Sequence, residues 1–476
     1  MTSLSALQRT AILAVLSAMA LAVLDAGVVN VALPNLAAHF QAPPSDTILI
    51  VSAYQAALLV GLLPSAHIAG RYGDRRIFTA GIGLFCGASL LCALAPSLPL
   101  LIAARILQGL GAAAIMALGV ALLRAALGND RLGAGIAWNA LTVALCSAAA
   151  PTIGAAILSL APWPGLFLAG LPVGAAAMLA SRALPKDQGK RSAVDTPSIA
   201  LHIATVILFV VAFKVAATQA LLAITLAFSA VPFVAILVRR ARCQRAPMLP
   251  IDLLGLRAFA VQMGASICCF IGQSIGLVAL PFHLQAALSH DLLTMALVIS
   301  CWPLGVACTS LVVGRVKCGL KPAAQCIAGG AILGAGLLLL ASLPLFAGAF
   351  PLAASTALCG VGFGLFQLAN NRTLFLAAPL ERAAAAGGLQ GTARLAGQTT
   401  GTLITALLFA LGSTALAPPA GLAIAAMFAL AAALLAGLGA THSLPIRDMS
   451  VHEHCPPQQP FIPPPAPAPC CAPRGR

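Results

Sequence analysis

Long apolar runs recur along almost the whole sequence, and each has the length of one membrane-crossing helix. A bilayer core needs about 20 mostly apolar residues per helix, and fourteen such runs can be marked in this chain. They span residues 11–33, 47–68, 77–95, 98–122, 132–160, 165–181, 197–217, 218–237, 258–280, 292–313, 322–343, 346–368, 393–411 and 419–440. Only 8% of the residues are charged, against roughly a quarter in a soluble globular protein. The sequence therefore predicts an all-α integral membrane protein with fourteen transmembrane helices.

The basic residues support this count, because they are confined to alternate connections. All but two of the 26 Lys and Arg residues, Arg105 and Lys214, fall near the N-terminus, in every second loop or in the C-terminal tail. Positive charge collects on the cytoplasmic side of a membrane protein, so both termini are predicted to be cytoplasmic. The net charge of +15 is then a signal of topology, and nucleic-acid binding is not expected. The first run is too long for a cleavable signal peptide, and a multi-pass protein of the cell inner membrane is expected.

The two longest cytoplasmic connections divide the spans into groups of six, two and six. We predict a first six-helix bundle in residues 1–184, linkers with two additional transmembrane helices in residues 185–256, and a second six-helix bundle in residues 257–446. Two bundles related by a pseudo-two-fold axis are typical of transporters that bind substrate near the bilayer midplane. Residues 447–476 are rich in Pro and are predicted to be a disordered cytoplasmic tail. The His and Cys residues of the tail show no ligand spacing, so no metal site is predicted.

Two charged residues lie deep in the apolar runs of the first predicted bundle, where a charge is costly. Asp25 is the only acidic residue in any predicted span, and Arg105 is the only basic residue in the spans of this bundle. Counted from the outer ends of their runs at 1.5 Å per residue, they lie roughly 13 and 10 Å deep, so the two can meet. Either Asp25 is a carboxylate that binds a proton or a cationic substrate, with Arg105 tuning it, or the two form a static ion pair between helices.

The segments that contain these two residues follow known sequence motifs. "LDAGVVNVALP" includes Asp25 and Asn30, and "RILQGLGAA" includes Arg105 and Gln108. Further along the chain, "GVGFGLFQLANNR" and "GLQGTARLAGQTTGT" resemble the twelfth and thirteenth spans of the protein family from which these motifs come. With these motifs the chain resembles the major facilitator superfamily, specifically its fourteen-span drug:proton antiporter branch, the group of methyl viologen and quaternary ammonium efflux pumps.

The resemblance implies roles for named residues. Asp25, Arg105, Gln108 and Asn30 are expected to form the group that binds the proton or the substrate. In "APTIGA", Pro151 and Gly154 match the antiporter motif of the fifth span, which is expected to shape the helix that moves or seals the first bundle. A cytoplasmic gate loop is expected after the second span. It consists of Gly70, Arg71, Gly73, Asp74, Arg75 and Arg76.

The chain departs from the motifs of that branch at several positions, among them the sixth-span motif, of which "WPGLFLAGLP" keeps only Trp163, Phe167 and Pro172. Gly27 stands where the first-span motif has Thr, and Ala150 stands where the fifth-span motif begins with Gly. Gly70 occupies the position of an Asp in the loop motif, and Asp74 lies four residues further on. Because this loop is expected to hold the two bundles together through charge contacts, the missing Asp bears on its conformational role.

The expected activity is proton-coupled efflux of lipophilic, cationic, toxic compounds by alternating access, as in a multidrug antiporter. The expected partners are these small molecules, protons and the lipid bilayer. The proton gradient is the energy source, no cofactor is expected, and a monomer is expected. The alternatives are an exporter of a single metabolite or antibiotic and, third, a non-transporting membrane sensor. No nucleophile–base pair, metal-ligand spacing or phosphate-binding glycine loop indicates an enzyme.

Overall fold

The computed structural model describes residues 5–128, 131–186, 195–244, 249–287, 292–315, 321–343, 348–379, 382–412 and 415–442. The regular elements in these ranges are all helices. Thirteen of the helical segments are long and apolar enough to cross a membrane, so the predicted all-α membrane class is confirmed. The predicted tail, residues 447–476, lies outside the described residues.

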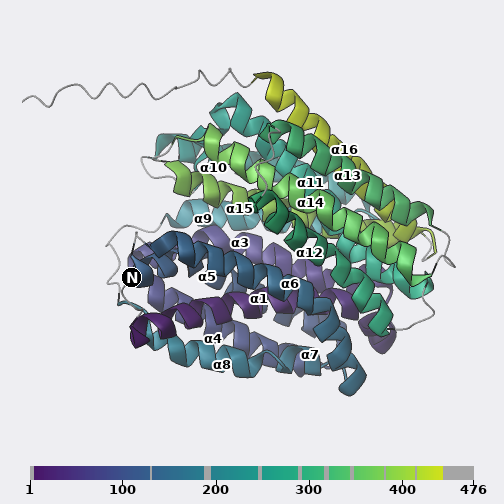
Figure 1. The fold of residues 1–476 in the computed structure, drawn as a ribbon, viewed down its shortest axis with the longest axis horizontal. Coiled ribbons are helices and arrows are strands. Elements are labelled where there is room, and N and C mark those ends of the chain that lie inside the picture. Colours follow the sequence, from purple (N-terminus) through teal and green to yellow (C-terminus); the bar gives the residue numbers. More distant parts are fainter. Residues whose placement is uncertain are drawn as a thin grey trace, which may run out of the picture. The chain divides into compact units, whose positions relative to one another are not determined.

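The helices follow the predicted spans in chain order (Figure 1). The first six spans correspond to α1 (Ala6–Phe40), α3 (Leu49–Tyr72), α4 (Asp74–Ala93), α5 (Leu98–Leu127), α6 (Leu132–Leu160) and α8 (Leu171–Ala180). The short helix α2 (Pro44–Thr47) precedes α3, while α7 (Gly165–Leu168) and the 3-10 turn η2 (Ser181–Ala183) flank α8. The later spans are α9 (Thr196–Val215), α10 (Ala220–Cys243), α11 (Arg257–Ala287), α12 (Leu292–Arg315), α13 (Pro322–Ser342), α14 (Ala349–Ala377), α15 (Ala383–Leu411) and α16 (Ala417–His442).

Helix α15 differs from its prediction in length. The run predicted at residues 393–411 is only its second part, because the helix begins at Ala383. It carries Gln390, Arg394 and Gln398, which lower its hydropathy below that of the thirteen segments long and apolar enough to cross a membrane. The prediction that all Lys and Arg residues other than Arg105 and Lys214 lie outside the spans is therefore wrong, since Arg394 lies inside this helix and already falls within the run at residues 393–411.

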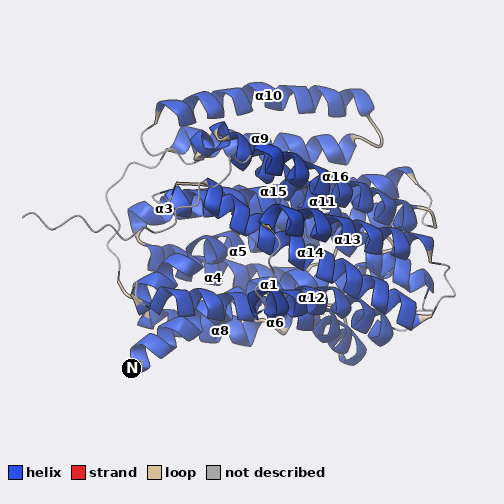
Figure 2. Ribbon diagram, turned by 45° about the horizontal axis from the view of Figure 1, so that its top comes forward, coloured by secondary structure: helices blue, strands red, loops and turns tan. Residues whose placement is uncertain are grey.

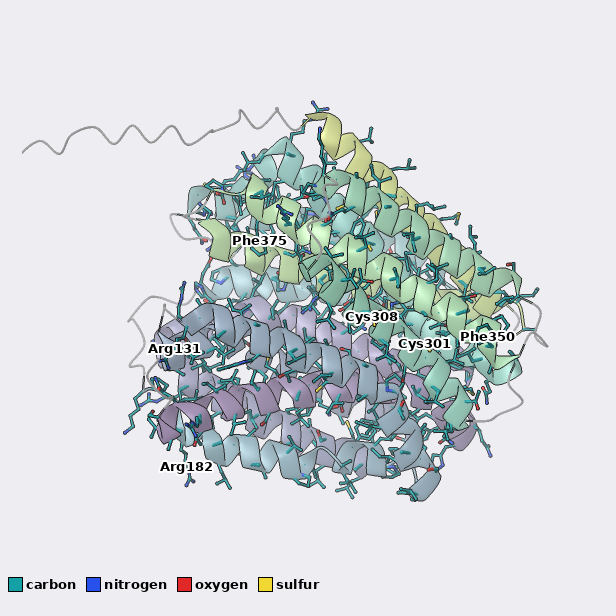
Figure 3. The ribbon with its side chains drawn as sticks, viewed as in Figure 1. Arg131, Arg182, Cys301, Cys308, Phe350 and Phe375 are labelled. Atoms are coloured by element: carbon teal, nitrogen blue, oxygen red, sulfur yellow. The ribbon has the colours of Figure 1, made fainter. Side chains whose placement is uncertain are left out.

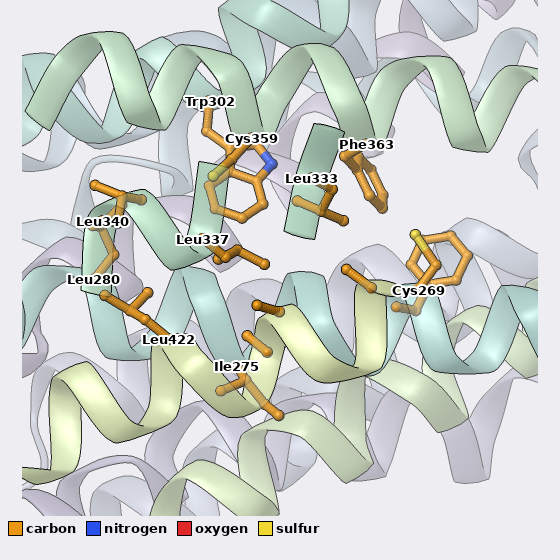
Figure 4. Packing of buried hydrophobic residues seen from close by; sticks show 14 of the residues in the cluster. Cys269, Ile275, Leu280, Trp302, Leu333, Leu337, Leu340, Cys359, Phe363 and Leu422 are labelled. Carbon is orange, nitrogen blue, oxygen red and sulfur yellow. The ribbon is translucent and has the colours of Figure 1, made fainter. Parts of the chain in front are cut away.

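The buried side chains form several clusters, of which two lie mainly within one group of six spans each and a third joins residues of both groups, such as Leu33 and Phe409. Helices α11 to α14 and α16 share a cluster around Trp302, which lies beside Cys359 and Leu337 (Figure 4). Helices α1, α3, α4 and α5 share another, which includes Phe78 and Phe85. Long apolar side chains also point away from the helices, as the labelled side chains of Phe350 and Phe375 do in Figure 3. These residues are 84% and 45% exposed, as a surface in contact with lipid requires.

The two groups meet along several helix pairs. Helix α6 packs against α12, α3 against α15, and α1 against α11. Thr152 of α6 and Ser300 of α12 share a hydrogen bond of 3.0 Å. Thr402 of α15 donates to Gln55 of α3 at 3.2 Å. The contacts between the groups thus include neutral polar pairs from α6 with α12 and from α3 with α15.

Helices α9 and α10 form an antiparallel pair at one edge of the helices in Figure 2. Asp195 caps the start of α9 and accepts hydrogen bonds from Arg240 at 2.9 Å and Gln244 at 2.5 Å, both from the end of α10 or just after it. Burial raises the pKa of the Asp195 carboxyl, but hydrogen bonds from Ser198, Gln244 and Arg240 outweigh this and lower the pKa to about 2. The backbone N–H of Asp195 also donates to His67 at 3.1 Å, which ties the pair to α3.

Candidate functional site

The side chains of Asp25 and Arg105 meet in the interior of the first six spans, as their similar predicted depths allow. Asp25 comes from α1, and the guanidinium of Arg105 on α5 donates to its carboxylate in a close ion pair. Their side chains are 7% and 1% exposed. A charge buried to this degree is tolerated only when its partners compensate for the lost water. The predicted contact is therefore confirmed, and the remaining partners of each group decide what the pair can do.

Arg105 has acceptors besides Asp25. Its Nη1 also donates to Gln108 Oε1 at 2.5 Å, and its Nε donates to the carbonyl of Ile50 at 3.4 Å. The guanidinium carbon lies 4.2 Å from the centre of the Tyr54 ring, a cation–π contact whose strength grows as water is excluded. Arg105 is thus held in place by α3 and by its own helix, independently of Asp25.

Gln108 links the ion pair to α4. Its Nε2 donates to Asp25 Oδ1 at 2.9 Å and to Ser89 Oγ at 2.8 Å. Because Gln108 follows Arg105 by three residues, both side chains project from one face of α5. We refer to Asp25, Tyr54, Ser89, Arg105 and Gln108 as the Asp25 cluster. It joins α1, α3, α4 and α5. Its members on α5, Arg105 and Gln108, belong to the fourth-span motif described above.

Asn30, the remaining residue predicted for this group, does not join the Asp25 cluster. It lies five residues after Asp25 on α1, and its Oδ1 is buried without a hydrogen-bond partner among the described residues. Gln273 of α11 has an orphaned Oε1 of the same kind. Buried amide oxygens of this type are rare in folded proteins, and each is a place where water or a ligand can bind.

The predicted antiporter motif lies directly against α1. Pro151 is inside α6, and Gly154 packs on Val28, such that a Cβ at Gly154 would lie 3.1 Å from the Val28 carbonyl. One turn earlier, Gly27 faces Ala150, and a Cβ at Gly27 would lie 2.5 Å from that of Ala150. Close packing of α1 on α6 thus begins two residues after Asp25, which ties the position of the carboxylate to α6.

The predicted gate loop is much shorter than expected. Helix α3 continues through Gly70 and Arg71 to Tyr72, and α4 starts at Asp74, so Gly73 alone makes the turn. Its φ of 96° lies in a region that glycine adopts without strain. The prediction of a loop is therefore wrong for the residues on either side, while their role as a gate stays a prediction.

The basic residues after this turn line a groove. Arg75 donates to the carbonyl of Leu184 at 3.1 Å. Together with Arg76 and Arg182 it borders a pocket of about 730 Å³ between α4 and α8, and Arg182 is labelled at this end of α8 in Figure 3. The contact joins the start of α4 to the end of the sixth span, within one bundle, whereas the sequence motif implied contacts between bundles.

Sequence analysis missed Arg394. This residue lies eleven positions after the start of α15, about 16 Å along the helix. Its Nε is buried and has no hydrogen-bond partner among the described residues. The Ala-rich segment before it, "AAAAGGLQGTA", was the available signal, because alanine favours helix and the helix therefore extends past the apolar run.

Three comparisons with known proteins bear on this arrangement. The family model of the Major Facilitator Superfamily matches residues 15–261. The chain is 38% identical over 407 residues to the uncharacterized transporter YebQ of Escherichia coli (strain K12), covering 84% of this chain and 88% of that protein. It is 28% identical over 386 residues to the multidrug resistance protein Stp of Mycobacterium tuberculosis (strain CDC 1551 / Oshkosh), covering 79% and 71%. It is 25% identical over 394 residues to the riboflavin transporter RibZ of Clostridioides difficile (strain 630), covering 81% and 85%.

The fold is also shared with solved transporters. A POT family transporter crystallised with a thioalcohol-conjugated peptide superimposes with a TM-score of 0.66 at 15% identity, covering 90% of this chain and 95% of that one. At this identity the likeness concerns the fold alone. The family match covers more than half of the chain, and the first of the relatives above is similar over most of its length. The chain belongs to the Major Facilitator Superfamily and is a membrane transporter.

Proposed function

We propose that this protein exports small lipophilic compounds across the inner membrane in exchange for protons, and that Asp25 is the carboxyl group that takes up and releases the proton. The observation that carries the proposal is the Asp25–Arg105 pair, with both side chains almost completely buried. Ionisable residues at this depth are expensive and are usually functional. Relatives named as multidrug resistance protein and as multidrug efflux pump support export of toxic compounds.

The surroundings of Arg105 make protonation of Asp25 feasible. When the carboxyl takes up a proton, the charge attraction between α1 and α5 is lost. Arg105 then keeps Gln108 Oε1, the Ile50 carbonyl and the Tyr54 ring as partners, so it is not left as a bare buried cation. Protonation therefore releases α1 from α5 at lower cost than removal of the only partner of a buried charge.

Helix α1 is placed to pass this change on. It packs against α6 and α11, and α6 in turn packs against α12 of the second group. A shift of α1 at Asp25 therefore reaches helices on both sides of the surface between the groups. Proton and substrate would each favour one facing state, and exchange would follow from the shift in populations.

The sequence motifs favour cationic compounds, and the structure restricts how a cation can bind at Asp25. Asp25 is the one acidic residue that the described helices place far from a helix end. A cation that binds there has to replace Arg105, which donates to the carboxylate in a close pair. Export of one metabolite is the second candidate, supported by the relative named riboflavin transporter RibZ and by the orphaned amide oxygens of Asn30 and Gln273.

Transport by Asp25→Asn in proteoliposomes tests the proposal. Purified wild type and variant are reconstituted at equal density, and an imposed pH gradient drives movement of lipophilic cations, neutral compounds and riboflavin. The variant keeps the size of the side chain but cannot exchange a proton, so we expect it to lose gradient-driven transport and retain exchange down a substrate gradient. Asp252→Asn, at an exposed ion pair with Arg382, is the matched control. Full gradient-driven transport by Asp25→Asn would remove the assigned role.

A further inference from the structure

Arg394 lies well inside the membrane part of the protein, between the two groups of helices. One turn before it, α15 passes Leu62 of α3 at a distance of 3.7 Å from the site of a Cβ at Gly391. Two turns after it, Thr402 donates to Gln55 of α3. These contacts place Arg394 at a level between Leu62 and Gln55, about 15 to 25 Å along α3 from its C-terminal end. This depth is beyond the reach of lipid headgroups.

The charge of Arg394 has no counterpart in the described structure. Its buried Nε makes no hydrogen bond, and no ion pair or ring contact compensates it there. Asp25 is already matched by Arg105. The other described acidic residues all lie at helix starts or in a 3-10 turn: Asp46, Asp74, Asp195 and Asp252. The described interior therefore carries one positive charge in excess.

The side chains one turn before and one turn after Arg394 on α15 are polar but neutral. Gln390, one turn earlier on the same face of α15, donates to Ser266 of α11 at 2.9 Å and to Asn371 of α14 at 3.2 Å. Gln398 follows one turn later on that face. Amides can orient a bound ligand, but they cannot neutralise a guanidinium. Arg394 is half-buried, and its buried Nε lacks an acceptor among the described residues. A cation at this depth without an anionic partner is unfavourable, so this position can accommodate an anion from outside the chain.

We propose that Arg394 binds the carboxylate, or an equivalent anionic group, of the transported compound. The planar guanidinium presents paired N–H donors that match the two oxygens of a carboxylate. The substrate class is then a lipophilic acid or zwitterion, with its apolar part between the helix groups. The claim that the bound compound is also transported rests on the proposed function. The claim that Arg394 binds an organic anion does not depend on it.

Equilibrium binding without a proton gradient tests this proposal. Wild-type protein in nanodiscs is titrated with three pairs of radiolabelled aromatic acids and their uncharged amides, of which 1-naphthylacetate and 1-naphthylacetamide form one pair. Charge-assisted hydrogen bonds to arginine predict a preference of about ten- to a hundredfold for the acid. Because no gradient is present, the measurement reports on Arg394 even if Asp25 has no part in coupling. Absence of an acid preference in all three pairs would overturn the proposal.

Variants separate binding at Arg394 from general effects. Arg394→Gln should bring the acid and amide affinities together, and Arg394→Lys should keep part of the preference. Arg372→Gln, on the exposed surface of α14, is the matched control and should bind like wild type. Without ligand, Arg394→Gln should unfold at a temperature no lower than that of wild type, because it removes an uncompensated charge; this also shows that the variant folds.

Chloride is the other source of an anion at this depth. If chloride fills the position, it alone should raise the unfolding temperature of wild type and not that of Arg394→Gln, while acids and amides bind equally well. That outcome would overturn the proposal for an organic substrate. The expected result is that each acid raises the unfolding temperature in an Arg394-dependent manner, and that millimolar chloride does not.

Discussion

The contact between Gly27 and Ala150 predicts a strong coupling between two substitutions. In the efflux pumps that the sequence resembles, the position of Gly27 is Thr and the position of Ala150 is Gly. The larger residue of the pair is therefore on the first span in those proteins and on α6 in this one. A Cβ added at Gly27 would lie 2.5 Å from that of Ala150, at least about 1 Å closer than the optimal separation of two carbon atoms. The two departures from the motifs are therefore one exchange across one helix interface.

The magnitude follows from this geometry. Gly27→Ala forces α1 and α6 apart, and overpacking of this kind costs about 1 to 3 kcal/mol. Ala150→Gly loses a buried methyl group and helix propensity, about 1 to 2 kcal/mol. In the double variant the methyl group has only moved from one helix to the other, so its unfolding free energy should lie within about 1 kcal/mol of wild type. The expected coupling is about 2 kcal/mol in the favourable direction.

Equilibrium unfolding in mixed micelles, followed by the fluorescence of the 3 Trp residues, measures all four proteins. Gly133→Ala on the same helix α6 is the control for a new methyl group, because nothing lies within 4 Å of the added Cβ. If the cost of the double variant equals the sum of the costs of Gly27→Ala and Ala150→Gly to within about 0.5 kcal/mol, the two residues do not share a contact, and the two departures from the motifs are unrelated.

Three further predictions follow from the structure. Gly111→Ala should lower the unfolding temperature markedly, because its Cβ would lie 2.6 Å from the backbone N of Phe85 and backbone cannot move aside as a side chain can. Asp195→Ala should destabilise the protein by about 1 kcal/mol at neutral pH. Since the pKa of this carboxyl is lowered to about 2 from an unfolded value of about 3.9, the stability it confers is present above pH 4 and should fade between pH 4 and 2, which thermal unfolding at several pH values can follow. Arg105→Lys should abolish pH-gradient-driven transport in proteoliposomes, because a single ammonium cannot reproduce the contacts to Asp25, Gln108 and the Ile50 carbonyl.

Much of the fold could be predicted because hydropathy and charge alternation depend on the bilayer alone. The meeting of Asp25 and Arg105 could be predicted as well, since depth along a helix follows from residue counting. Tyr54 and Ser89 could not, because nothing in the sequence says which polar residues of α3 and α4 face the pair. Gln108 was accessible, as the residue three positions after Arg105 on the same helix face.

The errors have a common physical cause. A hydropathy window finds the apolar part of a helix, whereas helix ends depend on capping and propensity. For this reason the run at residues 393–411 was found, but the start of α15 at Ala383 was not, and Arg394 at the edge of the run was counted with the loop residues although it lies well inside the helix. In the same way, the apolar run that ends at residue 68 and the loop motif of the resemblance implied a loop at Gly70 and Arg71, although the helix continues until Gly73 makes the turn.

The buried Arg105 and the half-buried Arg394 differ in a way that bears on how transport is coupled. Arg105 keeps two hydrogen-bond acceptors and a ring when Asp25 is protonated, whereas Arg394 has none among the described residues. The first can therefore stay in place while a proton comes and goes, and the second requires a ligand. If proton and substrate bind at these two places, they do not compete for one position. Their influence on each other must then pass through the packing of α1 on α6 and α11 and of α15 on α3, which makes the Gly27–Ala150 contact a determinant of coupling as well as of stability.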